Sequence, residues 1–338
     1  MIPPSRSAVN MAFVRMHARM VATRERVTSS GAFRSVSRAT ARSLAATQDR
    51  RRRRSRRVRA AFSVVIAALL LVGVSCRLHG QQWRTLNVAR QQLDSSPLAV
   101  KVRYGTGRLT LAAAPTPYLY HMQLRYDAAR AEPRAQWDAA SRTVTLGVAN
   151  SGVRWTSGRN TDLATMALGL SPSVPLDLSV EVGAAESTLD LSGLWLRTLD
   201  VRSGASATRI RFLTPSAHPV DRIEIESGAA QFTAERLANS GAKDVIIHGG
   251  LSLVELDLTG AWQRDMALSL DLAMGKGELT LPMSVGVRVT VDHASSMLRI
   301  EGLKKVGNIW ESDGFASAAH KLVVSVHSSV SSLSITRR

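Results

Sequence analysis

The stretch Leu176-Asp177-Leu178-Ser179-Val180-Glu181-Val182 alternates apolar and polar side chains. Alternation over about 4–8 residues is typical of a half-buried β-strand, because successive side chains of a strand point to opposite faces. Runs of this kind begin 23, 24, 22, 23 and 19 residues apart, at Leu176, Leu199, Ile223, Val245, Leu268 and Val287. An interval this regular predicts a repeated structural unit.

Most units continue with a turn of small residues and a second short strand. Ser203-Gly204-Ala205 precedes Ile210-Arg211-Phe212, for example. One such unit cannot bury its apolar face alone, whereas stacked units share a continuous core. The sequence therefore predicts a mainly β chain, with a β-solenoid of two-strand coils of about 23 residues over 175–338. A two-sheet β-sandwich of hairpins is the alternative, and the near-constant interval favours the solenoid.

An earlier β block is predicted over residues 98–149. The segment from Val100 to Leu111 has the pattern of strand, glycine turn and strand, and Thr143 to Leu146 adds another strand. Residues 150–174 are rich in Ser, Gly and Arg and are predicted to be a loop. The polar residues 77–97 are predicted to be a tether.

Basic charge is concentrated at the N-terminus. The 338-residue chain has a formal net charge of +18, yet residues 1–59 alone hold sixteen Arg, no Lys and two acidic residues. This segment lacks periodic apolar residues and is predicted to be disordered. An alternative is that residues 1–57 are not translated and that the protein begins at Val58. The nearly neutral remainder argues against nucleic acid as a partner.

An uncharged run of seventeen residues, 60–76, follows the arginine-rich segment 51–59 and ends at Cys76, the sole cysteine of the chain. A basic segment, an apolar segment and small residues are the order of a secretory signal peptide. Gly73-Val74-Ser75-Cys76 resembles a lipobox, whose cysteine is lipidated on sulfur and becomes the new N-terminus. By that resemblance, Cys76 is the predicted lipid attachment site of a lipoprotein, with membrane lipid as its partner.

Two other interpretations of residues 60–76 remain open. The run just reaches the lower limit of about 17 residues for a transmembrane helix, and the arginines would then keep residues 1–59 in the cytoplasm. A buried core helix is disfavoured by the arginine block at its start. Both leading interpretations predict a membrane-anchored protein whose β domain is extracytoplasmic, either periplasmic or on the cell surface.

No catalytic motif is evident, and neither a cofactor nor a metal site is predicted. The glycines of Gly105-Thr106-Gly107 and Gly275-Lys276-Gly277 lie between strands, so they are predicted to be turn residues and not phosphate-binding loops. The eight histidines are scattered without metal-ligand spacing. Asp292-His293 with Ser295 and Ser296 has the residue types of a catalytic triad, but sequence neighbours rarely form one, and a polar turn is predicted.

Carboxylates on successive units are the strongest indication of an enzyme. Paired carboxylates about 5–9 Å apart support glycoside hydrolysis. Four acidic residues could project from one face of the stack, namely Glu255, Asp257, Asp271 and Glu278. The simpler interpretation is that they form the solvated face of each strand.

Three tryptophans fall near the edges of repeats, namely Trp195, Trp262 and Trp310. An open end of a stacked β structure exposes apolar core and unpaired strand edges. These tryptophans are therefore predicted to cap the ends of the stack. Binding of a sugar or a partner by exposed rings is the alternative.

The alternating strands, the glycine turns and the closing segment, which runs from Gly307 to Ile335, resemble the toast-rack family of bacterial envelope proteins. They are also similar to the β domains of LiaF-like and adhesin-like proteins of unknown function. The resemblance covers residues 98–336 and implies an anchored β domain that faces outward. In the better-understood members it implies sensing or restraint of envelope-stress signalling.

Together these patterns predict a non-enzymatic, membrane-anchored envelope protein. Its outward polar faces would form an interaction or stress-sensing surface for envelope proteins or polysaccharide. The competing hypothesis is a β-helix enzyme that acts on polysaccharide of the envelope.

Overall fold

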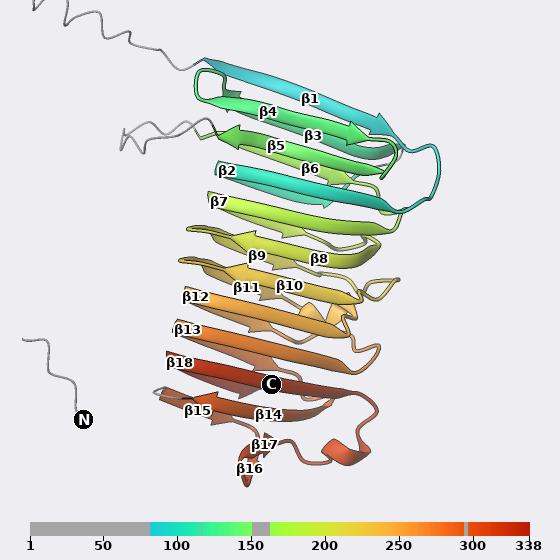
Figure 1. The fold of residues 1–338 in the computed structure, drawn as a ribbon. Coiled ribbons are helices and arrows are strands. Elements are labelled where there is room, and N and C mark those ends of the chain that lie inside the picture. The colour runs from blue at the N-terminus through green and yellow to red at the C-terminus, as the bar shows by residue number, and fades with distance from the viewer. Residues whose placement is uncertain (1–81, 116, 151–162, 294–296) are drawn as a thin grey trace, which may run out of the picture. The chain divides into compact units, whose positions relative to one another are not determined.

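The computed structural model describes residues 82–338 except 116, 151–162 and 294–296 (Figure 1). The regular structure is β-strand, apart from the short 3-10 helices η1 (Leu237–Ser240) and η2 (Phe315–Ser317). The prediction of a mainly β chain is confirmed. No helix in this described part is long and apolar enough to cross a membrane. The basic segment 1–59, the apolar run 60–76 and Cys76 lie outside the described residues.

The described residues form 18 strands in two ladders, called the A ladder and the B ladder (Figure 1). In spatial order, the A ladder contains β4 (Ala131–Asp138), β5 (Thr143–Asn150), the first halves of β2 (Leu98–Ala113) and β7 (Leu176–Asp190), β8 (Leu196–Ser203), β10 (Arg222–Ser227), the first halves of β12 (Asp244–Asp257), β13 (Met266–Leu281) and β18 (Lys321–Arg337), and then β14 (Gly286–His293), β17 (Ile309–Glu311) and β16 (Lys304–Val306). The B ladder contains β1 (Trp83–Gln91), β3 (Tyr118–Asp127), β6 (Thr165–Leu170), the second halves of β2 and β7, β9 (Ala207–Arg211), β11 (Gln231–Glu235), the second halves of β12, β13 and β18, and β15 (Met297–Glu301).

The two ladders are joined along a corner. The long strands β2, β7, β12, β13 and β18 each contribute their first half to the A ladder and their second half to the B ladder. Elsewhere in the stack, two shorter strands such as β8 and β9 supply the A-ladder segment and the B-ladder segment separately. A rung is defined here as one A-ladder segment with the B-ladder segment that follows it. The rungs stack along the direction of backbone hydrogen bonding, about 4.7–4.9 Å apart.

Rungs in the middle of the stack are parallel and in register. Leu199, Ile223, Val245 and Leu268 are successive Cα partners, at separations of 24, 22 and 23 residues. Residues at the predicted interval of about 23 residues are therefore neighbours in register over this part of the chain. Hairpins of a sandwich would pair antiparallel, so the sandwich alternative does not describe these rungs.

Both ends of the stack depart from sequential order. β2 lies between β5/β6 and β7, and β18 lies between β13 and β14/β15. The predicted stacking of Val287 on Leu268 is therefore wrong, because Val324 of β18 pairs with Leu268 on one side and Val289 on the other. The last strand, β18, is as apolar on its inner face as β14. Its position between β13 and β14 gives β18 hydrogen-bonded partners along both edges.

Antiparallel strands close both ends, and two predicted boundaries change as a result. β1 pairs antiparallel with β3, so the predicted tether 77–97 contains a strand. Its Leu86 and Val88 pack against the core at alternate positions, which the sequence prediction overlooked. The predicted loop 150–174 contains β6, which pairs with β2 and β3. At the other end, β16 and β17 form an antiparallel edge on β14.

The core is one contiguous apolar cluster between the ladders. The unit at 223–240 has few apolar residues, yet Phe232 is fully buried and η1 is buried beside it. Asn239 of η1 ties three rungs together. Its amide nitrogen donates to the carbonyl oxygen of Phe212 (2.7 Å), and its amide oxygen accepts from the backbone N–H of Ala261 (2.8 Å).

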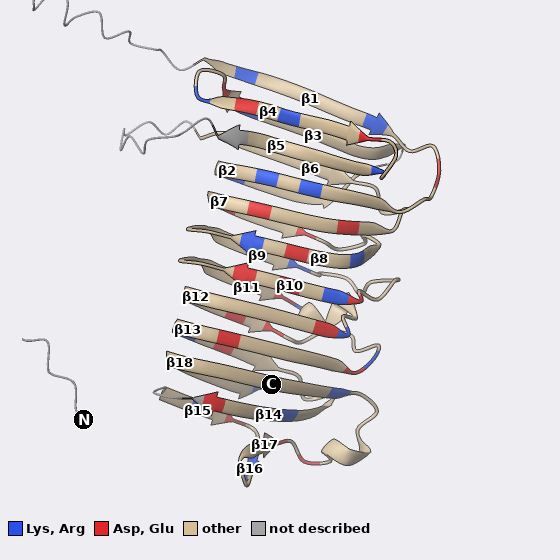
Figure 2. Ribbon diagram, viewed as in Figure 1, with Lys and Arg blue, Asp and Glu red and all other residues tan. Residues whose placement is uncertain are grey.

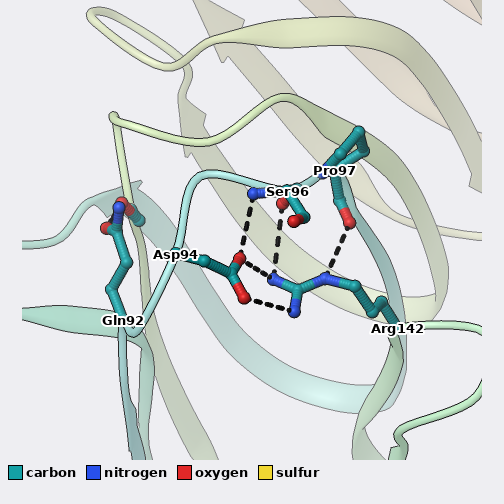
Figure 3. A network of polar contacts seen from close by, with 6 residues as sticks. Gln92, Asp94, Ser96, Pro97 and Arg142 are labelled. Atoms are coloured by element: carbon teal, nitrogen blue, oxygen red, sulfur yellow. Dashed lines mark hydrogen bonds and ion pairs between the residues drawn. The ribbon is translucent and has the colours of Figure 1, made fainter.

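A polar clamp holds the out-of-order strand β2 at its start (Figure 3). The guanidinium of Arg142, in the β4–β5 turn, donates to both carboxylate oxygens of Asp94 (2.8 and 3.1 Å) and to the carbonyl oxygen of Pro97 (3.2 Å). The backbone N–H of Ser96 donates to the same carboxylate (2.9 Å). That hydrogen bond, followed by the charge of Arg142, holds the pKa of Asp94 below its usual value.

Candidate functional site

A long groove follows the corner of the stack on its outer side. It has a volume of about 1020 Å³ and is lined by residues of β7, β8, β10, β12, β13, β18 and β14, together with the turns that follow several of these strands. Seven neighbouring strands at about 4.8 Å spacing give it a length of roughly 29 Å. This feature is called the corner groove.

One wall of the corner groove is a row of charged and histidine side chains, called the charge row, which continues past the groove lining to Arg103 of β2. One residue comes from the same position of each strand, and neighbours in the row are Cα partners in register. Acidic residues alternate with Arg or His along the row, and Figure 2 shows both signs of charge on neighbouring strands. In spatial order the row is Arg103, Glu181, Arg202, Glu226, His248, Asp271, His327 and Asp292.

Side chains within the charge row pair with their neighbours. Arg103 Nε lies 3.2 Å from Glu181 Oε2, and Arg202 Nε lies 3.4 Å from Glu226 Oε2. His248 Nδ1 lies 2.9 Å from Asp271 Oδ2, and His327 Nδ1 lies 3.8 Å from Asp292 Oδ2.

All eight side chains of the charge row are at least 40% exposed. Exposed pairs of this kind contribute little to stability. The charge row is therefore better suited to recognition than to holding the fold together.

The floor of the groove is a row of small residues, two positions after the charge row in each strand. Its members are Gly183, Gly204, Gly228, Gly250, Ala273 and Ser329. A Cβ added to Gly204 would lie 3.0 Å from the carbonyl oxygen of Gly183, and one added to Gly228 would lie 3.2 Å from that of Gly204. Small residues therefore let successive turns stack closely, and they leave the floor free of large side chains.

The next position along each rung differs between the two halves of the groove. In the half built by β12, β13 and β18, Leu251, Met274 and Val330 are Cα partners and are 59%, 47% and 56% exposed. In the other half, Ala184, Ala205 and Ala229 directly follow the floor residues. An apolar row therefore accompanies only the half of the charge row that contains histidine.

The charge row was not among the features predicted from the sequence. A signal for it exists, because each repeat carries a charged or histidine residue, an inward residue and a small residue in succession. Glu181-Val182-Gly183 and Arg202-Ser203-Gly204 are two of these triplets. Aligning the repeats on their small residues would have placed these side chains in one column.

The four predicted carboxylates do not share one face. Glu255 and Glu278 are Cα partners on the B ladder, and Asp257 lies two residues along β12. Asp271 belongs to the A ladder and lines the corner groove.

The B-ladder carboxylates have ordinary surface partners. Lys276 Nζ pairs with Glu278, which raises the pKa of this lysine. The hydroxyl of Thr233 donates to Glu255 (3.2 Å). Neither Glu255 nor Glu278 lines the corner groove.

Only one of the three predicted capping tryptophans lies at an end. Trp310 is on β17 and packs against the core. Trp195 lies between β7 and β8, where its ring stacks on that of His218 at 3.9 Å between centroids, and Trp262 lies between β12 and β13. The connections between successive rungs hold both of these rings, a position that repeat spacing alone does not reveal.

The opposite end of the stack is capped by Trp137 of the outermost A strand, β4. Its ring packs against the core and lies beneath the guanidinium of Arg90, 4.0 Å from the ring centroid.

The segment Asp292-His293 with Ser295 and Ser296, predicted to be a polar turn, is described only in part. The Asp292 carboxylate belongs to the charge row, while the side chain of His293 and residues Ser295 and Ser296 lie outside the described residues. Within the described ranges, no group of three or more His, Cys, Asp and Glu side chains is arranged to hold a metal ion.

Comparison with protein families gives one match, over residues 80–235, to the N-terminal domain of toast_rack, DUF2154. Residues 80–235 are therefore similar to a toast-rack N-terminal domain. The resemblance to the toast-rack family is confirmed, over a shorter range than the 98–336 expected. Comparison with curated proteins gives no match.

Solved structures of similar fold are distant. A proposed cell adhesion protein from Clostridium sporogenes has a TM-score of 0.42 at 14% identity, over 76% of this chain and 100% of that chain. A proposed adhesin from Bacteroides fragilis has a TM-score of 0.39 at 11% identity, over 77% and 98% of the two chains. Likenesses this distant carry no conclusion about function.

The toast-rack domain match ends inside the stack. It stops at Glu235, the last residue of β11, whereas the stack continues through β12, β13, β18, β14 and β15. The charge row is divided at the same place. Arg103, Glu181, Arg202 and Glu226 lie within the toast-rack domain, and His248, Asp271, His327 and Asp292 lie beyond it.

Proposed function

We propose that this protein is a non-enzymatic interaction protein of the bacterial cell envelope. In this proposal its stacked rungs are a β-solenoid that presents the corner groove to an extended ligand, an envelope protein or a polysaccharide, outside the cytoplasm. The observation that carries the proposal is the continuity of the groove across seven strands. Its volume is at the upper limit of ligand pockets, about 300–1,000 Å³, and its length suits a polymer better than a compact small molecule.

The toast-rack domain supports placement in the envelope, as does the adhesin-like or stress-sensing role that the family resemblance implies. The charges along the groove wall favour a binding role over a catalytic one. Its carboxylates alternate with Arg or His and are exposed, whereas catalytic carboxylates usually need a site that shifts their pKa values apart.

A groove-filling substitution tests the proposal. Ala273 and Ala267 are both exposed residues on the outer face of β13, and only Ala273 lines the corner groove. Binding of the purified full-length protein to isolated bacterial envelopes should be lost in Ala273→Trp and retained in the matched control Ala267→Trp. Equal binding by both variants would remove the groove from the proposed function.

Membrane anchoring through Cys76 is part of the proposal. Metabolic labelling with a palmitate analogue should mark the wild-type protein and leave Cys76→Ala unlabelled. Equal labelling of the two proteins would contradict lipid attachment at Cys76. Fractionation of Cys76→Ala then separates the two anchoring hypotheses, since a transmembrane helix would keep this variant in the membrane.

The alternative of a polysaccharide-acting enzyme gains no comparable support. Two of the predicted carboxylates, Glu255 and Glu278, are Cα partners on the B ladder, outside the corner groove. A glycosidase would need such a pair to flank a bound sugar chain.

A further inference from the structure

We propose that the half of the corner groove built by β12, β13, β18 and β14 binds an extended basic peptide segment at neutral pH and releases it on acidification. The inference rests on the proposed function, since it names the ligand of the same groove. This half is called the histidine half. The half that contains Glu181, Arg202 and Glu226, with Arg103 beside it in the charge row, is called the arginine half.

The charge balance of the two halves differs at neutral pH. In the arginine half of the charge row, the guanidinium groups of Arg103 and Arg202 stand beside the carboxylates of Glu181 and Glu226, so their charges balance near neutral pH. The histidine half contains Asp271 and Asp292, and its groove lining includes neither Lys nor Arg. When both imidazoles are neutral, two carboxylates therefore face the groove without a cationic neighbour in this half.

Acidification reverses this difference. Histidine is the side chain that changes charge between about pH 5 and 8. His248 is flanked in the row by Glu226 of β10 and Asp271 of β13, and His327 by Asp271 and Asp292 of β14. Protonated imidazoles would make the charges alternate along the whole row. They would form ion pairs with the carboxylates, as Arg103 and Arg202 do in the arginine half.

The apolar row favours a peptide as the cation. Leu251, Met274 and Val330 lie directly after the floor of the histidine half, beside the groove lining, and are about half exposed. Lys and Arg combine an aliphatic stem with a charged head, so one side chain of this kind can use both the apolar row and the carboxylates. The small floor residues allow a peptide backbone to approach closely.

The length of the histidine half sets the size of the ligand. Four strands at about 4.8 Å spacing span roughly 14 Å, which matches four to five residues of an extended chain at about 3.3 Å per residue. Hexalysine is therefore a suitable probe, and hexaglutamate is its charge-reversed control.

Fluorescence anisotropy with labelled hexalysine tests the inference on the full-length protein in a non-ionic detergent, at constant ionic strength. Wild type should bind hexalysine about tenfold more tightly at pH 8 than at pH 5, because two exposed ion pairs together supply about that factor. Asp271→Asn combined with Asp292→Asn should remove this binding at pH 8. Glu255→Gln, on the B ladder outside the corner groove, should leave the affinity and its pH dependence unchanged.

A second double variant gives the histidine half the permanent cations of the arginine half. His248→Arg combined with His327→Arg should lose hexalysine binding at both pH values, since every carboxylate then has a permanent cationic neighbour. Circular dichroism checks that the variants fold, and the wild-type pH comparison needs no variant. Equal hexalysine affinity at pH 5 and 8, retention of binding by the double Arg variant, or equal binding of hexaglutamate would overturn the inference.

The outcomes for the two proposals are separable. If Ala273→Trp abolishes envelope binding while the wild-type protein does not bind hexalysine, the groove binds a ligand other than a basic peptide. If hexalysine binds as expected while Ala273→Trp leaves envelope binding intact, the histidine half is a basic-peptide site and the envelope ligand binds elsewhere.

Discussion

The arginine half and the histidine half of the corner groove have the same backbone and different chemistry. Both continue one in-register row, and both have a floor of small residues. In one half the cations are Arg103 and Arg202, and in the other the equivalent positions are His248 and His327. The comparison teaches that the stack determines where a side chain stands, whereas the residue type determines whether its charge responds to pH.

The charge row ends at β5, where the backbone and not recognition determines the residue type. On β5 the partner of Arg103 is Gly147, which has no side chain to extend the row. Gly147 has a positive φ of 135°, and a Cβ there would lie 1.9 Å from the carbonyl oxygen of Arg103. Backbone geometry, and not recognition, therefore determines the residue at this position.

The largest expected effect tests whether the two halves share one core. Leu178→Ala and Leu270→Ala remove buried side chains beneath the arginine half and the histidine half, respectively. Each should lower the free energy of unfolding by about 2–5 kcal/mol, through lost burial and a residual cavity. Urea denaturation measures the change, and the outward neighbours Ser179→Ala and Ser269→Ala should change it by less than about 0.5 kcal/mol. A large loss in only one half would mean that the halves fold as separate units.

The next effect concerns the backbone at the corner. Gly275 has a φ of 134°, and a Cβ there would lie 1.9 Å from the carbonyl oxygen of Ser252. Gly275→Ala should therefore cost about 3 kcal/mol, and Gly147→Ala, with the same geometry, should cost as much. Gly307 has a φ of 62° and no heavy atom within 4 Å of an added Cβ, so Gly307→Ala should cost only about 1 kcal/mol. Equal midpoints of urea unfolding for all three variants would contradict the geometric argument.

A substitution in the arginine half should give it the pH response of the histidine half. Arg103→His combined with Arg202→His leaves Glu181 and Glu226 without permanent cations in the row. Hexalysine affinity at pH 8 should rise by about fivefold and return to the wild-type value at pH 5. Lys101→His lies on the same strand, two residues before the charge row, and should change nothing. Anisotropy titrations measure the effect, and no gain at pH 8 would show that the row position alone does not create the site.

The smallest expected effect lies beside the arginine half, at Asp200 of β8. Burial raises the pKa of this carboxyl, and the carboxylates of Glu224 and Glu226 add to the effect, while Arg202 opposes it. A raised pKa means that the ionised carboxylate disfavours folding above the folded-state pKa. That cost vanishes below about pH 3.9, the usual value for the unfolded chain.

Asp200→Asn should therefore stabilise the protein at pH 7 by less than about 1 kcal/mol, since the side chain is 36% exposed. Chemical denaturation at pH 7 and pH 3 provides the check, with no gain expected at pH 3. A gain of equal size at both pH values would assign the effect to packing and not to charge.

Much of the strand pattern is predictable from alternation. Leu199, Ile223, Val245 and Leu268 were expected at equivalent positions, and they are successive partners. The strand that begins near Val287 was also expected, yet its neighbour was not, because β18 enters between it and β13. Alternation identifies the buried face of a strand and contains no information about which strand lies beside it.

The groove was predictable only in part. Asp271 was singled out as a carboxylate, but as a partner of Glu255 and Glu278, which lie on the other ladder. The corner changes the direction in which outward side chains point, so residues a few positions apart in one strand face different sides. Trp195 was expected at an end and lies on a connection, where it stacks on His218.

The sequence by itself determined which side chains are buried, where the chain turns at small residues, and that basic charge is concentrated in residues 1–59. These are local properties, because they depend on the alternation of a strand and on residue type. The tertiary structure alone decided that β18 fills the place between β13 and β14, and that His327 thereby stands between Asp271 and Asp292. Backbone hydrogen bonds between parallel strands are the same for any residue type, so only the stacking of the whole chain selects these neighbours.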